Sequence, residues 1–255
     1  MGFLEAFILG VVEGLTEFLP VSSTGHLIVT SHFLNLKQSV QIKAFEIIIQ
    51  FSAILAVLFA YKEHFSFKKI ILWQKIFVSF LPIGIIGFLF ASFIKNLFSV
   101  NIVAWAFIIG GIVFLITEKF YKEKEHFVNE VDKISWKQAI FIGLAQVLAL
   151  IPGASRAGAT IVGALWVGLD RKTSARFSFL LAIPVMIAVT GYDLVKHHDK
   201  FLGNDMLALM IGFITSFIVA YFSMRAFMVF LEHFTFVFFG IYRIILGVVL
   251  LLFFI

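Results

Sequence analysis

The stretch EGLTEFLPVSSTGHL, residues 13–27, decides how this chain must fold. It places two glutamates, a proline, three consecutive hydroxyl residues and a histidine among apolar neighbours. Proline removes a backbone donor and interrupts a helix, so we expect two half-helices that meet near Leu19–Ser23. The sequence therefore predicts a broken apolar segment over 3–34, with polar groups concentrated at its break.

A second apolar segment, 138–166, breaks in the same way at Ile151–Ser155, which reads IPGAS. Aligning Pro20 with Pro152 also aligns Ser23 with Ser155 and Phe45 with Phe177. Three unbroken apolar spans follow each broken segment, which is a repeated order of elements. We predict the spans at 45–61, 76–94, 102–118, 177–195, 206–224 and 235–255.

The composition sets the class of protein. Hydrophobic residues make up 61% of the 255 residues and charged residues only 14%, with a mean hydropathy of +1.05, whereas soluble domains carry about 25% charged residues. The apolar spans approach the ~20 residues that cross a bilayer as a helix. The sequence predicts an all-α polytopic membrane protein. It has no cysteine, which excludes disulfides and thiol redox chemistry.

The repeated order predicts an inverted repeat of two halves, each a re-entrant broken helix pair plus three transmembrane helices. If each half crosses the membrane an odd number of times, the halves have opposite orientations, as in many transporters. We expect one integral membrane domain over 1–255, with repeat one at about 1–120, a cytoplasmic linker at about 119–137 and repeat two at about 135–255. The apolar start is interrupted by glutamates, and we expect it to belong to the mature protein.

Loop charges predict the orientation. With the N-terminus outside, the inside loops hold 13 Lys and Arg residues, and the outside loops hold Lys37, Lys43, Lys95, Lys196 and Lys200. Basic residues accumulate in cytoplasmic loops, so this bias favours an outside N-terminus. Because the basic residues lie between apolar spans, membrane orientation explains the net charge of +5 better than nucleic-acid binding does.

Ionisable residues inside a membrane are costly and indicate function. Glu13 and Glu17 lie four residues apart, hence on one helix face. Ser22, Ser23 and Thr24 open the next half-helix, whose free amides favour an anion such as phosphate, although hydroxyl residues are also ordinary helix caps. His26 lies three residues after Ser23, within reach as a base that activates a hydroxyl nucleophile.

The second break supplies a positive charge. Arg156 begins the half-helix after Ser155, among small residues that let a ligand approach the backbone. Its planar guanidinium suits two parallel bonds to phosphate. Glu46 and Gln50 share a helix face, and three roles stay open for them: to orient His26, to bind water, or to form a hydrogen bond between helices. Arg243, beside Tyr242, either adds charge to the site or anchors at the interface.

The carboxylates at the first break would repel an anion. They are compatible with one if they are protonated, hold a histidine in its tautomer, or bind a divalent metal, since oxygen ligands suit Mg²⁺ or Ca²⁺. The pattern as a whole indicates phosphate chemistry within the membrane.

The motifs EGLTEFLPVSSTGHL, LAQVLALIPGASRAGAT and FSFLLAIPVM resemble those of the undecaprenyl-diphosphate phosphatase family, the bacitracin-resistance type. The resemblance covers nearly the whole chain. It implies release of the terminal phosphate of undecaprenyl diphosphate, a lipid carrier of cell-wall synthesis. It also implies bacitracin resistance, dependence on a divalent cation, an inner-membrane location and an active site that faces the periplasm or the outside.

Carried over by motif, the resemblance implies an acidic pair at Glu13 and Glu17, which also are the expected metal ligands. It implies Ser23 as nucleophile, His26 as base and Arg156 as the essential arginine. Ala157 stands where the family commonly has a serine, which removes one hydroxyl contact. The residues that we expect around the substrate are Ser22, Thr24, Gly25, Ser155, Gly158, Thr160, Glu46, Gln50 and Arg243.

Two rival chemistries stay open at this point: His26 as the nucleophile, or a metal-activated water. A rival function is a transporter or flippase of a polyprenyl phosphate lipid, because inverted repeats with broken helices are also carrier architecture. The expected partners are the polyprenyl diphosphate substrate and membrane lipid, without nucleic acid. A homodimer is also left open.

Overall fold

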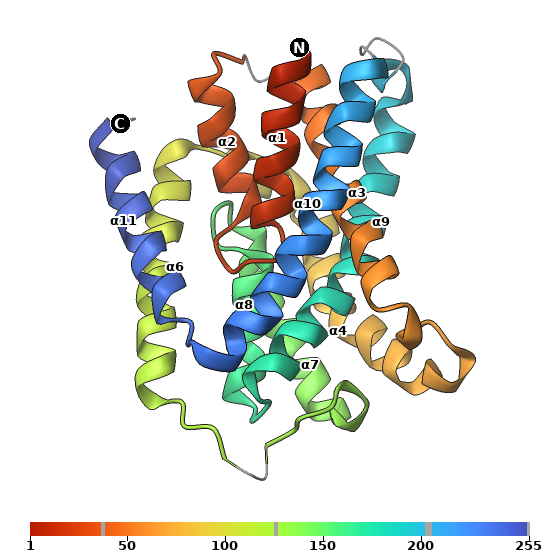
Figure 1. Ribbon diagram of the computed structural model, residues 1–255, viewed down its shortest axis with the longest axis vertical. Helices are drawn as coiled ribbons and strands as arrows, with labels where there is room; N and C mark the ends of the chain where they lie inside the picture. The colour runs from red at the N-terminus through yellow and green to blue at the C-terminus, as the bar shows by residue number, and fades with distance from the viewer. Residues whose placement is uncertain (37–38, 125–126, 202–205, 254–255) are drawn as a thin grey trace.

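The computed structural model describes residues 1–36, 39–124, 127–201 and 206–253. Helices account for the regular structure of these ranges, and no strand is found within them (Figure 1). The all-α membrane architecture is confirmed. Four short 3-10 turns, η1 to η4, join or extend the α-helices. The α-helices are α1 Phe3–Thr16, α2 Ser23–Phe33, α3 Val40–Ala60, α4 Ile70–Leu89, α5 Ala91–Asn96, α6 Val100–Phe120, α7 Trp136–Gln146, α8 Arg156–Trp166, α9 Arg171–Phe201, α10 Met206–His233 and α11 Val237–Phe253.

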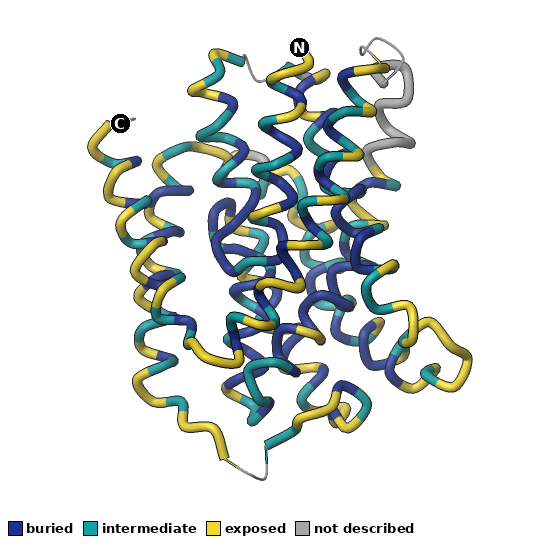
Figure 2. Tube along the Cα trace, viewed as in Figure 1, coloured by how far each residue is buried: buried dark blue, intermediate teal, exposed yellow. Residues whose placement is uncertain are grey.

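Both predicted breaks are present. The first separates α1 from α2 over residues 17–22, and the second follows α7 and the 3-10 turn η4, Val147–Leu150, before α8 begins. In Figure 1, α1 starts at the upper end of the molecule, whereas α7 follows the linker at the lower end. Each pair of half-helices packs together, and the turn between α1 and α2 lies in the buried centre (Figure 2).

The two turns have the same backbone structure, but the residues that correspond in it differ by one position from the alignment predicted from the sequence. Ser22 and Ser155 are the residues before α2 and α8, and both have a positive φ, 72° and 73°. The half-helices that follow them are each 11 residues long. Ser155 therefore corresponds to Ser22 and not to Ser23. Entry from opposite ends is what an inverted repeat requires; the symmetry between the halves remains a prediction.

Helices from the two halves of the chain interlock. α1 packs against α10, and α7 packs against α4, while α3 contacts α9 and α6 contacts α11. Small residues allow the close approaches, as is common for membrane helices. A Cβ on Gly14 would lie 2.8 Å from the Ser216 carbonyl oxygen, and one on Gly143 would lie 2.4 Å from that of Ser79. The proposed repeats are thus not separately packed bodies.

Five of the six predicted spans are long and apolar enough to cross a membrane by length and composition. They are α3, α4, α6, α9 and α10, with the span of α4 starting at Phe67. α11 is a shorter apolar helix of 17 residues that packs along α6. The last two residues of the predicted final span, 254–255, lie outside the described residues.

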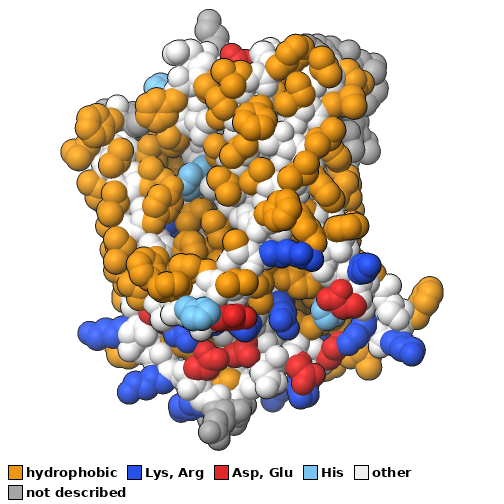
Figure 3. All heavy atoms as spheres, in the orientation of Figure 1, with side chains coloured by type: hydrophobic (Ala, Val, Ile, Leu, Met, Phe, Trp, Pro, Cys, Tyr) orange, Lys and Arg blue, Asp and Glu red, His pale blue; other side chains and the backbone are white. Residues whose placement is uncertain are grey.

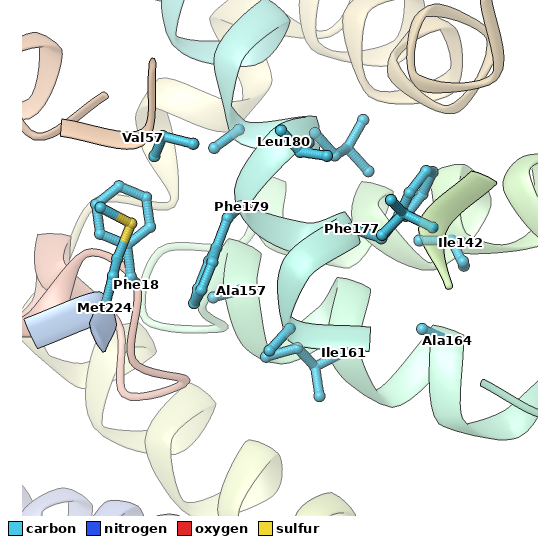
Figure 4. Close-up of a cluster of buried hydrophobic side chains, with 14 of the residues drawn as sticks. Phe18, Val57, Ile142, Ala157, Ile161, Ala164, Phe177, Phe179, Leu180 and Met224 are labelled. Carbon is cyan, nitrogen blue, oxygen red and sulfur yellow. The ribbon is translucent and has the colours of Figure 1, made fainter. Parts of the chain in front are cut away.

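A hydrophobic cluster packs between the first turn and the helices α8, α9 and α10 (Figure 4). Phe18 of the first turn packs edge-to-face on Phe179 of α9, with ring centroids 5.4 Å apart. Ala157 and Ile161 of α8 and Met224 of α10 belong to the same cluster. Because protein interiors are close-packed, this cluster fixes the first turn relative to α8 and α9.

Charged side chains gather at the end of the molecule that carries the linker, whereas hydrophobic ones cover its sides (Figure 3). Arg171 pairs there with Glu118 at 2.7 Å and with Glu123 at 2.9 Å. Burial raises the pKa of Tyr121, whose hydroxyl donates to the Leu169 carbonyl at 2.9 Å. This placement agrees with the expected inside loops. Of the expected outside residues, Lys37 lies outside the described residues, as do the side chains of Lys95, Lys196 and Lys200.

Candidate active site

The two serines that precede α2 and α8 hold a strained backbone. A non-glycine residue with positive φ costs on the order of 1–3 kcal/mol, and such residues cluster at functional sites. The strain at Ser22 and Ser155 turns the chain sharply, so that both second half-helices start beside the same space. Their first amides have no partners within the helix and carry the positive end of its dipole. This arrangement favours an anion at the meeting point.

A chain of short contacts joins the two breaks. The Ser23 hydroxyl donates to Glu17 Oε2 at 2.5 Å, and Arg156 Nη2 donates to Glu17 Oε1 at 2.8 Å. Glu17 is the last residue before the first turn, and its side chain is 4% exposed. A buried carboxylate is tolerated only with such partners. Glu17 thus connects a hydroxyl of the first broken segment with the guanidinium of the second.

Arg156 is anchored but retains an unused donor. Its Nη1 donates to the Ser178 carbonyl at 2.8 Å, and its guanidinium carbon lies 6.0 Å from the centre of the Phe18 ring. Nε has no hydrogen-bond partner among the described residues. The arginine is therefore held in place by α9 and the first turn, and its Nε is a buried donor without a partner.

Glu13 is completely buried one turn before Glu17, as their spacing predicts. Neither of its carboxylate oxygens accepts a hydrogen bond from a donor within the described part of the chain, although the Glu17 carboxyl lies within hydrogen-bonding reach of it. The charges near it are those of Glu17, Arg156 and Glu46. A buried carboxylate without partners is costly, so a proton or a cation is needed to balance it. Among the site residues, Glu13 is therefore the one that most needs to bind a proton or a cation.

His26 does not contact Ser23 in this structure. Its Nδ1 lies 2.8 Å from the Ser22 carbonyl oxygen, and its Nε2 lies 2.7 Å from the Tyr242 hydroxyl. A carbonyl only accepts hydrogen bonds, so Nδ1 carries the proton and Nε2 accepts from Tyr242. The group placed to take the proton of Ser23 is Glu17. The expected Ser23–His26 pair is thus replaced by Ser23–Glu17.

A polar pocket of about 210 Å³ lies where the two turns meet. Seven of the expected site residues line it, and they come from both broken segments and from α3: Glu17, Ser22, Ser23, Thr24, Gln50, Ser155 and Arg156. Apolar residues complete its wall, among them Ile83, Phe98, Ile151 and Val185. The pocket thus combines hydroxyls, a carboxylate and a cation in a mainly apolar surrounding.

Five expected substrate contacts, Arg243 among them, lie elsewhere. Gly25 packs on α6, where an added Cβ would lie 2.5 Å from the Phe107 ring. The Thr160 hydroxyl is buried and bonds Ser178 Oγ at 2.7 Å. Glu46 accepts from the Ser31 hydroxyl at 3.2 Å, and Gly158 lines a separate apolar cavity. These residues shape the surroundings of the polar pocket without lining it.

Arg243 is a structural clamp and not a wall of the polar pocket. It is fully buried, and its guanidinium donates only to backbone carbonyls. Nη1 reaches Pro20 at 3.1 Å and Ala154 at 3.0 Å, while Nη2 reaches Gly153 at 3.0 Å and Ala106 at 2.9 Å. One side chain of α11 therefore ties both turns to α6.

Two residues of the site were missed by sequence reasoning. Tyr242 holds His26, and Ser178 holds Arg156 through its carbonyl and Thr160 through its hydroxyl. Tyr242 is adjacent to an intramembrane arginine, which was an available signal. Nothing in the sequence marks the carbonyl of Ser178, because every residue carries one.

The fold and the site define a polytopic α-helical membrane protein with a buried, hydroxyl- and arginine-lined site for an anionic group. Comparison with known proteins gives the family. The sequence profile of the bacitracin resistance protein BacA family matches residues 6–249. The chain belongs to this family.

Relatives resemble the chain over its full length. It is 62% identical to the undecaprenyl-diphosphatase of Sulfurimonas denitrificans, over 100% of both chains. It is 58% identical to that of a Sulfurovum species, over 99% of both chains. The identity to the undecaprenyl-diphosphatase of the archaeon Methanococcus aeolicus is 51%, again over 100% of both chains.

Proposed function

We propose that this protein hydrolyses undecaprenyl diphosphate to undecaprenyl phosphate and inorganic phosphate. The observation that carries the proposal is the Ser23–Glu17–Arg156 chain inside a membrane protein of this family. The reaction recycles the lipid carrier of cell-wall synthesis. It also confers bacitracin resistance, as the family's description states.

In the first step, Ser23 Oγ attacks the terminal phosphorus and its proton passes to Glu17, the acceptor 2.5 Å away. The bond between phosphorus and the bridging oxygen breaks, and undecaprenyl phosphate leaves with the electron pair. Water then attacks the phosphoserine. The Ser23–phosphorus bond breaks, Glu17 returns its proton to Ser23, and inorganic phosphate is released.

Arg156 and the amides at the starts of α2 and α8 stabilise the charge on the transferring group, which is the main task in phosphoryl transfer. Arg156 lines the polar pocket, so its guanidinium charge lies beside the transferring group while its bond to Glu17 is kept. His26 acts outside the polar pocket: its hydrogen bond to the Ser22 carbonyl holds the strained turn that presents Ser23.

The residues present fit a divalent cation. Glu13 offers two buried oxygens without hydrogen-bond partners, and Glu17 lies one turn away. The described residues hold no group of three or more acidic, histidine or cysteine side chains suited to a metal ion. Mg²⁺ is commonly held by one or two carboxylates together with substrate phosphates. Glu13 and Glu17 would hold Mg²⁺ or Ca²⁺, and the ion would neutralise charge on the diphosphate.

The orientation follows from the charged end of the molecule. Lys and Arg side chains gather at the linker end (Figure 3), and such residues accumulate in the cytoplasm. The proposal places the protein in the bacterial inner membrane, with the N-terminus outside and the polar pocket open to the periplasmic side. Tagging the N-terminus for protease accessibility in intact spheroplasts tests it, because cleavage is expected only for an outside N-terminus.

The test of the function is phosphate release from undecaprenyl diphosphate in detergent by the wild type and by Ser23→Ala. The wild type is expected to release phosphate, EDTA to abolish the release, and added Mg²⁺ or Ca²⁺ to restore it. Ser23→Ala is expected to be inactive. A wild type that moves labelled lipid across liposomes without releasing phosphate would instead support the flippase alternative, which no observation favours at present.

A further inference from the structure

A second cavity, of about 640 Å³, lies between α6 and the broken segment α7–α8. Apolar and small side chains from α6, α7 and α8 line it, including Trp105, Ile109, Leu144, Val162 and Trp166. The one charged residue in its wall is Arg243, whose donors are engaged by backbone carbonyls. The cavity therefore offers no polar partner and suits a hydrocarbon ligand.

We propose that this apolar cavity binds the first isoprene units of the substrate's prenyl chain, an inference that rests on the proposed function. A lipid diphosphate needs a polar site for its head and an adjoining apolar site for its chain. Pockets of ~300–1,000 Å³ are usual for small-molecule binding, and the volume of the cavity falls within that range.

The two sites adjoin at the second turn, where they share one lining residue. Ile151 lines both the polar pocket and the apolar cavity. Phe98, just before α6, lines the polar pocket, and Ile102, in the first turn of α6, lines the apolar cavity. A chain attached to a diphosphate beside Ser23 and Arg156 thus passes over Ile151, between Phe98 and Ile102.

The cavity affects the chain-length specificity of the enzyme more than the overall free energy of substrate binding. The bilayer is as apolar as the cavity wall, so transfer of a chain from one to the other releases little free energy. What the cavity supplies is a fixed path that holds the head group at the polar pocket. The contribution therefore appears as discrimination between long and short chains.

The experiment compares two tryptophan substitutions on one helix. Ile109 lines the cavity, whereas Ile112, three residues further along α6, does not; the two side chains have similar exposure, 57% and 44%. Ile109→Trp and Ile112→Trp are assayed with undecaprenyl diphosphate and with geranyl diphosphate, whose chain is too short to fill the cavity. The measured quantity is the ratio of kcat/KM for the long substrate to kcat/KM for the short one.

Ile109→Trp is expected to lower this ratio by about tenfold, mainly through KM for the long substrate, whereas Ile112→Trp leaves it unchanged. Should Ile109→Trp fail to elute as a folded protein, Val162→Phe fills the cavity from α8 and is expected to give the same change. An unchanged ratio in a folded cavity variant overturns the proposal and assigns the cavity to ordinary membrane lipid. A wild type inactive on both diphosphates would instead overturn the proposed function.

Discussion

The two broken segments share a shape but divide the chemistry. Each has a strained serine followed by an 11-residue half-helix. The first carries Glu13, Glu17 and Ser23, whereas the second carries Arg156. Ser155 caps its own helix by accepting from the Gly158 amide at 3.1 Å, but Ser22 makes no such bond. The same backbone structure thus carries the nucleophile and the acidic residues in the first segment and the cation in the second. Neither segment forms the site alone.

The largest effect is expected from Glu17, the residue that joins the two segments. Glu17→Gln removes the acceptor of the Ser23 proton and the charge that faces Arg156. General-base catalysis contributes roughly 10²–10⁴-fold, so we expect kcat for phosphate release to fall by about 10³-fold. The matched control is Glu5→Gln in the first turn of α1, which is partly exposed and far along the helix from Glu17, and it should retain wild-type kcat. Activity of Glu17→Gln within tenfold of the wild type would remove Glu17 as the base.

A smaller loss is expected from Arg156, the cation of the second segment. Arg156→Lys keeps the charge but loses the planar arrangement that reaches Glu17, Ser178 and phosphate together. We expect kcat/KM to fall by roughly 10²-fold. Arg225→Lys, at an exposed position of α10, serves as the control in the same assay. Equal activity of both lysine variants would show that charge alone suffices at position 156.

Arg243→Lys tests whether the two turns depend on one clamp. A lysine has a single nitrogen and cannot span the Pro20 and Gly153 carbonyls as the guanidinium does. Loss of buried hydrogen bonds costs about 1–3 kcal/mol, so we expect a lower thermal midpoint. We also expect a reduced kcat with an unchanged KM, because Arg243 does not line the polar pocket. A raised KM at unchanged kcat would instead indicate direct contact with the substrate.

The smallest effects separate the two strained serines. Ser155→Ala loses a helix cap, which costs about 1 kcal/mol, and should lower the thermal midpoint. Ser22→Ala loses no cap and should leave the midpoint near that of the wild type. Thermal unfolding of both variants in one detergent measures the difference. Equal midpoints would contradict the division of roles between the two turns.

Much of the fold follows from the sequence. The proline-containing breaks and the acidic pair on one helix face are local features and were located correctly. Five of the six apolar spans are also found as long helices, although the predicted span 76–94 extends beyond the end of α4 at Leu89 and the last span is a shorter helix. In contrast, the local sequence does not determine which site side chains form hydrogen bonds with one another. Whether Ser23 meets His26 or Glu17 depends on side-chain directions across a strained turn, and periodicity does not specify these directions.

The role of Arg243 also lay beyond sequence reasoning. Its ligands are carbonyls of Pro20, Ala106, Gly153 and Ala154, which come from three separate segments. A buried arginine in a membrane protein indicates function in general. Only the packing of α11 against α6 brings the Arg243 guanidinium onto the backbone carbonyls of both turns, outside the polar pocket.

The central claim is that the first segment supplies the nucleophile and the second stabilises the transferred phosphate. Rapid quenching of the wild type with undecaprenyl diphosphate, followed by mass spectrometry of its peptides, tests the claim directly. The account predicts a transient phosphate on Ser23 that accumulates and decays at rates compatible with turnover. Phosphate on His26, or full-rate turnover without any phosphorylated Ser23, would contradict it.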